Sequence, residues 1–105
     1  MKPVFLIIQE ANVYLKMDNK VKFREKMEEA IKLKPNQPDL YYNLGVIYAE
    51  VDNNYKARLY YGKAIEIDPN YLNAYSAKLH SCINIIIISA NYLKHLRKRA
   101  TDWLL

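Results

Sequence analysis

Two histidines and the single cysteine are the residues best suited to catalysis or metal binding. His80 and His95 lie 15 positions apart, and Cys82 follows His80 by two. A metal ion needs several ligands that converge on one point, and these residues lack the close helical spacing that would bring them together. Residues two apart on a helix point to different sides, so His80 is not placed to activate Cys82 as a nucleophile. We therefore expect no metal site, no cofactor and no enzymatic activity, and a buried or half-buried Cys82.

A basic segment near the C-terminus is a second candidate. Lys94, Arg97, Lys98 and Arg99 lie within six residues, whereas residues 1–70 are almost balanced in charge. The segment therefore accounts for most of the net charge of +5. It could contact phosphates or an anionic membrane surface, or it could be the solvated face of a helix whose cations favour its C-terminal end.

Length and composition set the broad class. The chain has 105 residues, of which 51% are hydrophobic and 26% charged, the profile of one soluble globular domain. Two glycines and four prolines are too few for a β-sandwich or barrel, which needs many turn residues. A single cysteine excludes an intramolecular disulfide framework.

Source and location are inferred from composition and from the apolar runs. Ile, Lys, Asn and Tyr make up 43 of the 105 residues, and their codons are AT-rich, so we expect a bacterial protein. No small-residue cleavage site follows the apolar run at the N-terminus, and no run approaches the ~18–20 residues of a spanning helix. We expect a cytoplasmic protein without a transmembrane segment, or a piece of a longer chain.

The chain repeats itself when it is compared with itself at an offset of 34. The identical pairs include Tyr14/Tyr48, Asp18/Asp52, Asn19/Asn53, Lys22/Lys56, Ala30/Ala64, Ile31/Ile65, Pro35/Pro69 and Asn36/Asn70. Chance does not readily give so many matches in one register without a gap. A period of this length is typical of helical repeat proteins.

Each unit is predicted to fold as helix, turn and helix. In the second unit, Pro-Asp at 38–39 suits the start of a helix, and Asp-Asn-Asn at 52–54 is a turn cluster. Pro69 ends the second helix, because the residue before a proline is disfavoured in the helical conformation. The first unit has the same plan, with helices over about residues 4–17 and 21–33.

The second unit resembles the tetratricopeptide repeat. The resemblance rests on a pattern of aromatic, small and apolar residues, here Tyr41, Leu44, Gly45, Tyr48, Ala57, Tyr61, Ala64 and Pro69. The first unit departs from it at Glu10, where the pattern has Leu, and at Phe23, where it has a small residue. The resemblance implies one all-α domain, a right-handed superhelix of about six helices in antiparallel pairs. Its repeats would cover 4–37 and 38–71, followed over 72–105 by a degenerate repeat or C-terminal capping helices.

Gly45 needs a physical reason, because a glycine inside a helix costs about 1 kcal/mol relative to alanine. We expect the reason to be a close approach of neighbouring helices, with the single methyl groups of Ala57 and Ala64 at the same contacts. Neither two-helix unit can bury its apolar face alone, so the units stack.

The third unit departs from the pattern. Leu79 replaces the glycine of the repeat, Lys98 replaces an alanine, and Ile86-Ile87 stand where the turn should be. Terminal repeats of helical solenoids are usually atypical because they cap the exposed core. We therefore expect the last unit to be a cap.

Two arrangements of the last unit are open. Helices over 71–84 and 90–104, joined around 85–89, would fold back as a cap and leave a monomer, which we favour. A single helix is the alternative, because neither glycine nor proline interrupts it, and its apolar stripe would then pair with another chain, for example in a homodimer. That stripe consists of Leu93, Leu96, Ala100, Trp103 and Leu104.

The ten tyrosines could stack on nucleic-acid bases, but core packing explains most of them. Six lie at aromatic or apolar-face positions of the units: Tyr14, Tyr41, Tyr48, Tyr60, Tyr61 and Tyr75. We therefore do not expect a nucleic acid as the main partner.

The family resemblance implies a concave surface, lined by the first helix of each pair, that holds a peptide or a partner helix. By register its lining is Ile8, Asn12, Tyr42, Asn43, Val46, Asn73, Ser76, Ala77 and His80. In co-chaperones of this family, two asparagines and three cationic side chains bind the C-terminal carboxylate of a peptide. Asn12 and Asn43 stand at the asparagine positions, but Ile8, Asn73 and Ala77 replace the cations, so a strong grip on a carboxylate is not expected.

The sequence therefore predicts a non-enzymatic protein–protein interaction module that binds a peptide or a partner helix. One alternative is a self-assembling piece that dimerises through its C-terminal helix. Another is anion binding, to nucleic acid or a membrane surface, through the basic segment.

Overall fold

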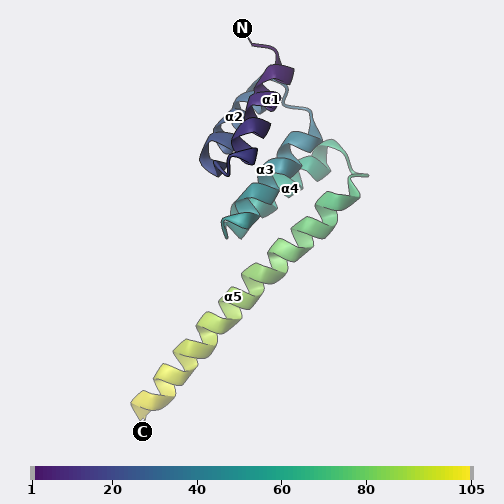
Figure 1. Ribbon diagram of the computed structural model, residues 1–105. Helices are drawn as coiled ribbons and strands as arrows, with labels where there is room; N and C mark the ends of the chain where they lie inside the picture. Colours follow the sequence, from purple (N-terminus) through teal and green to yellow (C-terminus); the bar gives the residue numbers. More distant parts are fainter. Residues whose placement is uncertain (1, 105) are drawn as a thin grey trace.

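The structure, a computed structural model, describes residues 2–104. This part of the chain consists of helices and connecting turns and contains no β-strand. The helices are α1 (Val4–Lys16), α2 (Lys20–Leu33), α3 (Pro38–Glu50), α4 (Asn54–Ile67) and α5 (Leu72–Leu104). The first four form two antiparallel pairs that stack into one body, and α5 starts against this body and extends well past it (Figure 1). The predicted all-α repeat architecture is confirmed.

The same turn joins the two helices of each pair. Asp18 and Asp52 have positive φ angles of 57° and 61°, the left-handed conformation that commonly ends a helix. The following residue, Asn19 or Asn53, caps the next helix, because its side-chain oxygen accepts a hydrogen bond from the backbone N–H three residues further on, at 3.1 and 3.2 Å. The Asp-Asn dipeptide therefore ends one helix and starts the next.

Small residues allow the helices of the body to approach closely. Ala11, Ala30, Ala57 and Ala64 are completely buried. A Cβ atom on Gly45 would lie 2.6 Å from Cδ1 of the buried Tyr61 ring, which is closer than real Cβ contacts come. The close approach expected at Gly45 is therefore confirmed.

Tyrosine rings fill the space beside these contacts. The Tyr48 and Tyr60 rings stack with centroids 5.4 Å apart and planes inclined by 6°. The Tyr41 hydroxyl donates a hydrogen bond to the Pro35 carbonyl oxygen at 2.9 Å. Core packing is thus the role of most of the six tyrosines assigned to it, but Tyr75 is 46% exposed and that assignment was wrong.

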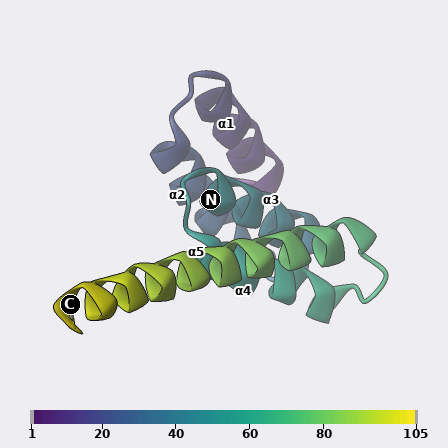
Figure 2. The same ribbon diagram turned by 90° about the horizontal axis from the view of Figure 1, so that it is seen from below.

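The last unit does not fold back, and the expectation of two helices over 71–84 and 90–104 was wrong. α5 is one helix of 33 residues, about 50 Å long at the helical rise per residue, so the described chain has five helices where about six were expected. Its N-terminal part packs on α4 and α3, with Ala74 and Ser81 buried. Residues 86–103 are all exposed, and Figure 2 shows the C-terminal end of α5 projecting beyond the other helices.

Two features of the sequence explain why α5 does not fold back. Ile86-Ile87 occupy the place of the Asp-Asn turn and continue the helix, because neither residue stops it. The residues that would face inward in a returning helix are polar, whereas their counterparts on α4 are apolar. They are Asn91, Lys94, His95 and Lys98, which stand one repeat period after Ala57, Tyr60, Tyr61 and Ala64. A hairpin in the register of the repeat would bury two lysines, which is unfavourable without partners.

Candidate functional site

Equivalent positions of the three units form two rows across α1, α3 and the first part of α5. The first row is Ile8, Tyr42 and Ser76, and the second is Asn12, Val46 and His80, with one repeat period between successive members. All six side chains are half-buried or exposed, and the half-buried Ile8, Tyr42 and Val46 also pack against the core. These positions belong to the set that the sequence assigned to one surface, which we call the row surface.

Tyr42 is the best-fixed side chain of this surface. Its ring centroid lies 5.7 Å from that of Tyr61 and 5.4 Å from that of Tyr71. Burial, reinforced by a hydrogen bond with Asp39, raises the pKa of Tyr71 to about 12. Tyr71 therefore stays neutral at ordinary pH, and Tyr42 is held between two uncharged rings.

Amide groups and small side chains complete the row surface. Asn43 and Asn73 are exposed, and Ala77 is half-buried against the core. An exposed amide can both donate and accept a hydrogen bond, so it can pair with the backbone of a peptide of any sequence. α3 contacts α5 directly, whereas α1 packs mainly on α2. The α3 and α5 parts of the surface are therefore the most closely joined.

The row surface lacks the charge needed to grip a carboxylate. Ile8, Asn73 and Ala77 are neutral, as expected from the sequence. Two lysines near α1 are already paired with Glu10, Lys2 at 2.6 Å and Lys26 at 3.1 Å, and their hydrogen bonds lower the pKa of the Glu10 carboxyl.

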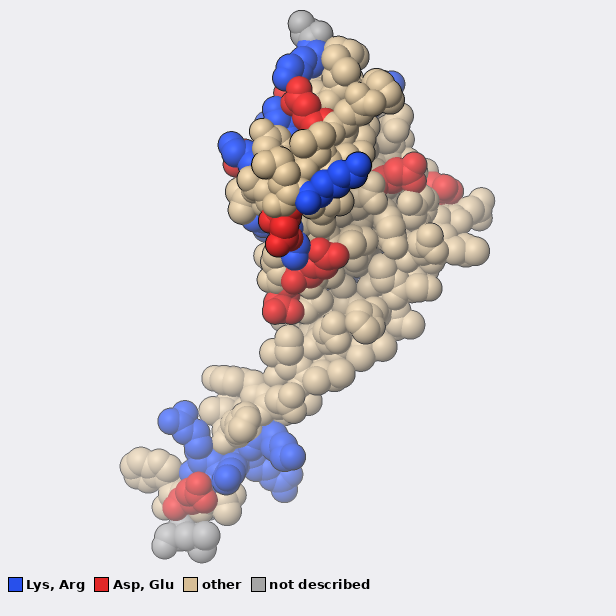
Figure 3. Space-filling model, viewed as in Figure 1, with Lys and Arg blue, Asp and Glu red and all other residues tan. Residues whose placement is uncertain are grey.

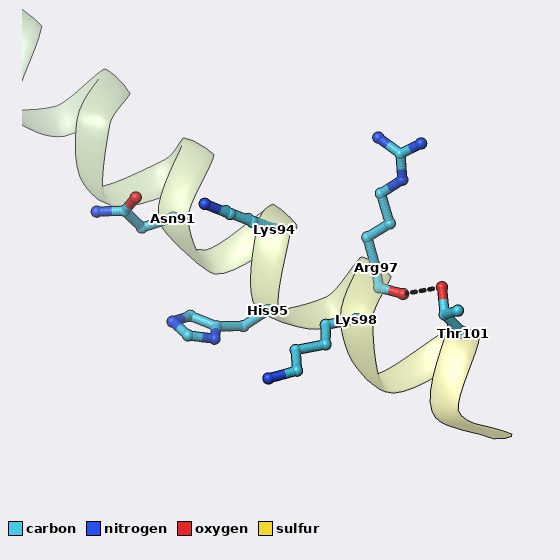
Figure 4. Close-up of a pocket in the computed structure, with 6 residues that line it drawn as sticks. All are labelled: Asn91, Lys94, His95, Arg97, Lys98 and Thr101. Carbon is cyan, nitrogen blue, oxygen red and sulfur yellow. Dashed lines mark hydrogen bonds between the residues drawn. The ribbon is translucent and has the colours of Figure 1, made fainter.

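The basic segment lies at the far end of α5. Lys94, Arg97, Lys98 and Arg99 are exposed, and Figure 3 shows the lysine and arginine side chains gathered near the C-terminal end of the helix, away from the body. In Figure 4 the labelled side chains point outward in different directions from a single helix. Among residues 2–104, all the side chains that line this site come from α5, so the basic segment is an open charged surface and not an enclosed cavity.

The residues suited to catalysis are not brought together. Cys82 is half-buried, as expected, and His80 is exposed. Within residues 2–104, no three His, Cys, Asp or Glu side chains lie close enough to hold a metal ion. None of the helices described combines the length and apolar character that a bilayer crossing requires.

Comparison with known proteins identifies the repeat. Residues 38–71 match the family model of the tetratricopeptide repeat, the segment that carries Gly45 and the Asp-Asn turn. Residues 38–71 form a tetratricopeptide repeat. No curated protein sequence matches it.

Several solved structures share the fold. The TPR2B domain of yeast Sti1, in complex with pHsp70, is 24% identical, with 83% of this chain covering 70% of that one at a TM-score of 0.73. A tetratricopeptide repeat domain from Salinibacter ruber is 26% identical, with 76% covering 87% at a TM-score of 0.70. MamA is 22% identical, with 93% covering 61% at a TM-score of 0.74.

Sequence reasoning missed the apolar residues on the N-terminal half of α5. Leu72 and Leu79 are 75% and 63% exposed, and Ile86 is 65% exposed. Comparing the chain with itself at an offset of 34 does not reveal these residues, because the third unit no longer follows the repeat pattern. Their spacing of seven residues was the signal that could have found them.

Proposed function

We propose that this tetratricopeptide-repeat protein binds an extended peptide or a helix of another protein on the row surface. The observation that supports the proposal is that half-buried or exposed side chains recur one repeat period apart on α1, α3 and α5. A module of this kind needs apolar contacts for affinity and amides for backbone recognition. Val46 and Tyr42 supply the first, and Asn43 supplies the second.

The peptide we propose differs from the chaperone peptides bound by two structural neighbours. One neighbour, the first TPR domain of Spaghetti (RPAP3), is bound to the HSP90 peptide SRMEEVD. Here the positions expected to hold cations are Ile8, Asn73 and Ala77. A peptide held here would therefore be recognised along its backbone and by apolar side chains, without selection for a free acidic C-terminus.

The test uses peptides selected from a random displayed library on the full-length protein. Selected peptides should bind the wild type in calorimetry and lose roughly tenfold or more in affinity to Val46→Glu, which places a charge in the middle of the apolar row. Lys63→Glu, on the exposed face of α4, is the matched control and should bind normally. Equal binding by the two variants would contradict the proposal.

A second function, contact with anions through the basic segment, is favoured by one observation. The four cations project from an unenclosed helix end (Figure 3). We propose only a weak, sequence-independent attraction there, which should fall steeply as salt is raised. Binding to a nucleic acid that is insensitive to salt would contradict it.

A further inference from the structure

The solvent-exposed side of α5 carries an apolar stripe along its whole length. The residues follow the a and d positions of five consecutive heptads, which is the pattern of a coiled-coil seam. The α5 stripe consists of Leu72, Tyr75, Leu79, Cys82, Ile86, Ser89, Leu93, Leu96, Ala100 and Trp103. Nine of these ten residues are apolar or aromatic, counting cysteine with them, and Ser89 is the exception.

The stripe is uncovered in the single chain. Exposure reaches 90% at Trp103 and is 62% at Leu93. The body packs on another side of α5, where Ala74 and Ser81 are buried. Contiguous apolar surface of this length marks an interaction site, and about three to four heptads already sustain a coiled coil.

We propose that a second copy of this chain covers the stripe, with the two α5 helices antiparallel. The first half of the stripe is equivalent, in the register of the repeat, to the surface of α3 that packs against α4. Tyr75, Leu79 and Cys82 stand one repeat period after three α3 residues that pack against α4. Those three residues are Tyr41, Gly45 and Tyr48. This surface of α5 is therefore suited to packing against another helix, and no helix within residues 2–104 covers it.

The spacing of side chains along the stripe fits an antiparallel register. If two copies cross midway between Ile87 and Ile88, each a position lies opposite a d position of the other copy. Leu79 then meets Leu96 of the other copy, and the large Tyr75 meets the small Ala100. Large residues opposite small ones pack without voids or overlap.

The distribution of charge favours antiparallel over parallel pairing. In a parallel pair the two basic segments would lie side by side and repel each other. In the antiparallel pair they lie at opposite ends, and each approaches the first half of the other α5. The gain is the separation of the two basic segments alone, because Arg58, Lys63 and Lys78 line the cleft between α4 and α5 there, and its one acid, Glu66, already pairs with Lys63 at 3.7 Å.

Neighbouring isoleucines provide a matched test of the interface. Ile86 is in the stripe and 65% exposed, whereas Ile87 is beside it and 50% exposed. We expect the wild type to be a dimer in sedimentation equilibrium. Ile86→Lys should raise the concentration at half dimerisation by roughly 30-fold or more, whereas Ile87→Lys should leave it nearly unchanged. Both side chains are exposed in the single chain, so helix content and melting of the monomer should be preserved in both variants.

Two outcomes would overturn the dimer. A wild type that stays monomeric at high concentration would show that a helix of a different protein, or a further part of a longer chain, covers the stripe. Equal effects of Ile86→Lys and Ile87→Lys would show that the stripe is not the interface. Peptide binding at Val46 is measured separately, so the proposed function can stand or fall independently.

The native cysteine tests the orientation. A parallel pair would place Cys82 of the two copies together, and mild oxidation would link wild-type chains covalently. An antiparallel pair places Cys82 opposite position 93 of the other copy. We therefore expect Leu93→Cys to form disulfide-linked dimers and the wild type to form none. Linked wild-type chains would overturn the antiparallel arrangement.

Discussion

Replacing Gly45 with alanine should destabilise the protein, although alanine is the better helix former. The substitution gains about 1 kcal/mol of helix propensity. It also places a methyl group 2.6 Å from Cδ1 of Tyr61. The Tyr61 ring is only 3% exposed and packs beside Tyr42, so it has no free space to move into, and overpacking of this kind costs roughly 1–3 kcal/mol.

The net effect should be a loss of about 1 kcal/mol in the free energy of unfolding, within the range that these two terms allow. For a domain of this size, that lowers the melting temperature by roughly 4–8 °C. Thermal unfolding followed by circular dichroism measures it directly. Leucine at the same position should be worse than alanine, because it inserts more volume at the same contact.

Gly62 provides the control. A Cβ there would meet Nζ of Lys78 at 3.5 Å, an ordinary contact, so Gly62→Ala should raise stability by up to ~1 kcal/mol. Opposite signs at the two glycines are the expected result. If Gly45→Ala were as stabilising as Gly62→Ala, the close-packing argument would be refuted. A Tyr61→Leu background should also reduce the cost of Gly45→Ala, as a double-mutant cycle would show.

Three further predictions concern the turn, the buried tyrosine and the charge of the row surface. Asn53→Ala removes the cap of α4 and should cost about 1 kcal/mol in urea unfolding, whereas Asn53→Asp should cost only a few tenths of that; equal losses would show that the cap is unimportant. Burial raises the pKa of Tyr61 to about 12, above the value near 10 of an unfolded chain, so its contribution to stability is complete below about pH 10 and is lost as the pH rises through 12. Tyr61→Phe should therefore flatten the fall in urea midpoint over that interval, and an unchanged slope would speak against this role of Tyr61. An acidic peptide with a free C-terminus should bind no better than the same peptide with an amidated end in calorimetry at physiological salt; micromolar binding that depends on the carboxylate would show the neutral surface argument to be wrong.

The repeated part of the fold could be predicted because its signals are local. Proline, the Asp-Asn turn and the period of the repeat fix where each helix starts and ends, and the expected helices over 4–17 and 21–33 differ from α1 and α2 by one residue each. The contact at Gly45 could also be predicted, since glycine inside a helix is unfavourable without a neighbour that needs the space.

The expectation that the last third of the chain folds back as two helices was wrong. It gave more weight to the usual behaviour of terminal repeats than to the local residues. Ile86-Ile87 contain no helix stop, and Lys94 and Lys98 cannot line the inside of a hairpin without partners. Both facts are readable from the sequence and indicate one continuous helix.

The candidate surface stays a prediction. The register of the repeat assigns Tyr42, Val46 and His80 to one surface, because equivalent residues of a repeat face the same way. The support of Tyr42 by Tyr71 was missed. Tyr71 lies in the connection between α4 and α5, where neither helical periodicity nor the repeat pattern indicates which way a side chain points.

The most direct test of the proposed function is to map a bound peptide by NMR. Amide signals of isotope-labelled protein would be followed while a library-selected peptide is added. The account predicts that the largest shifts occur in α1, α3 and residues 72–84, around Tyr42, Val46 and Ser76. Shifts confined to α2 and the outer face of α4, or to the basic end of α5, would contradict it.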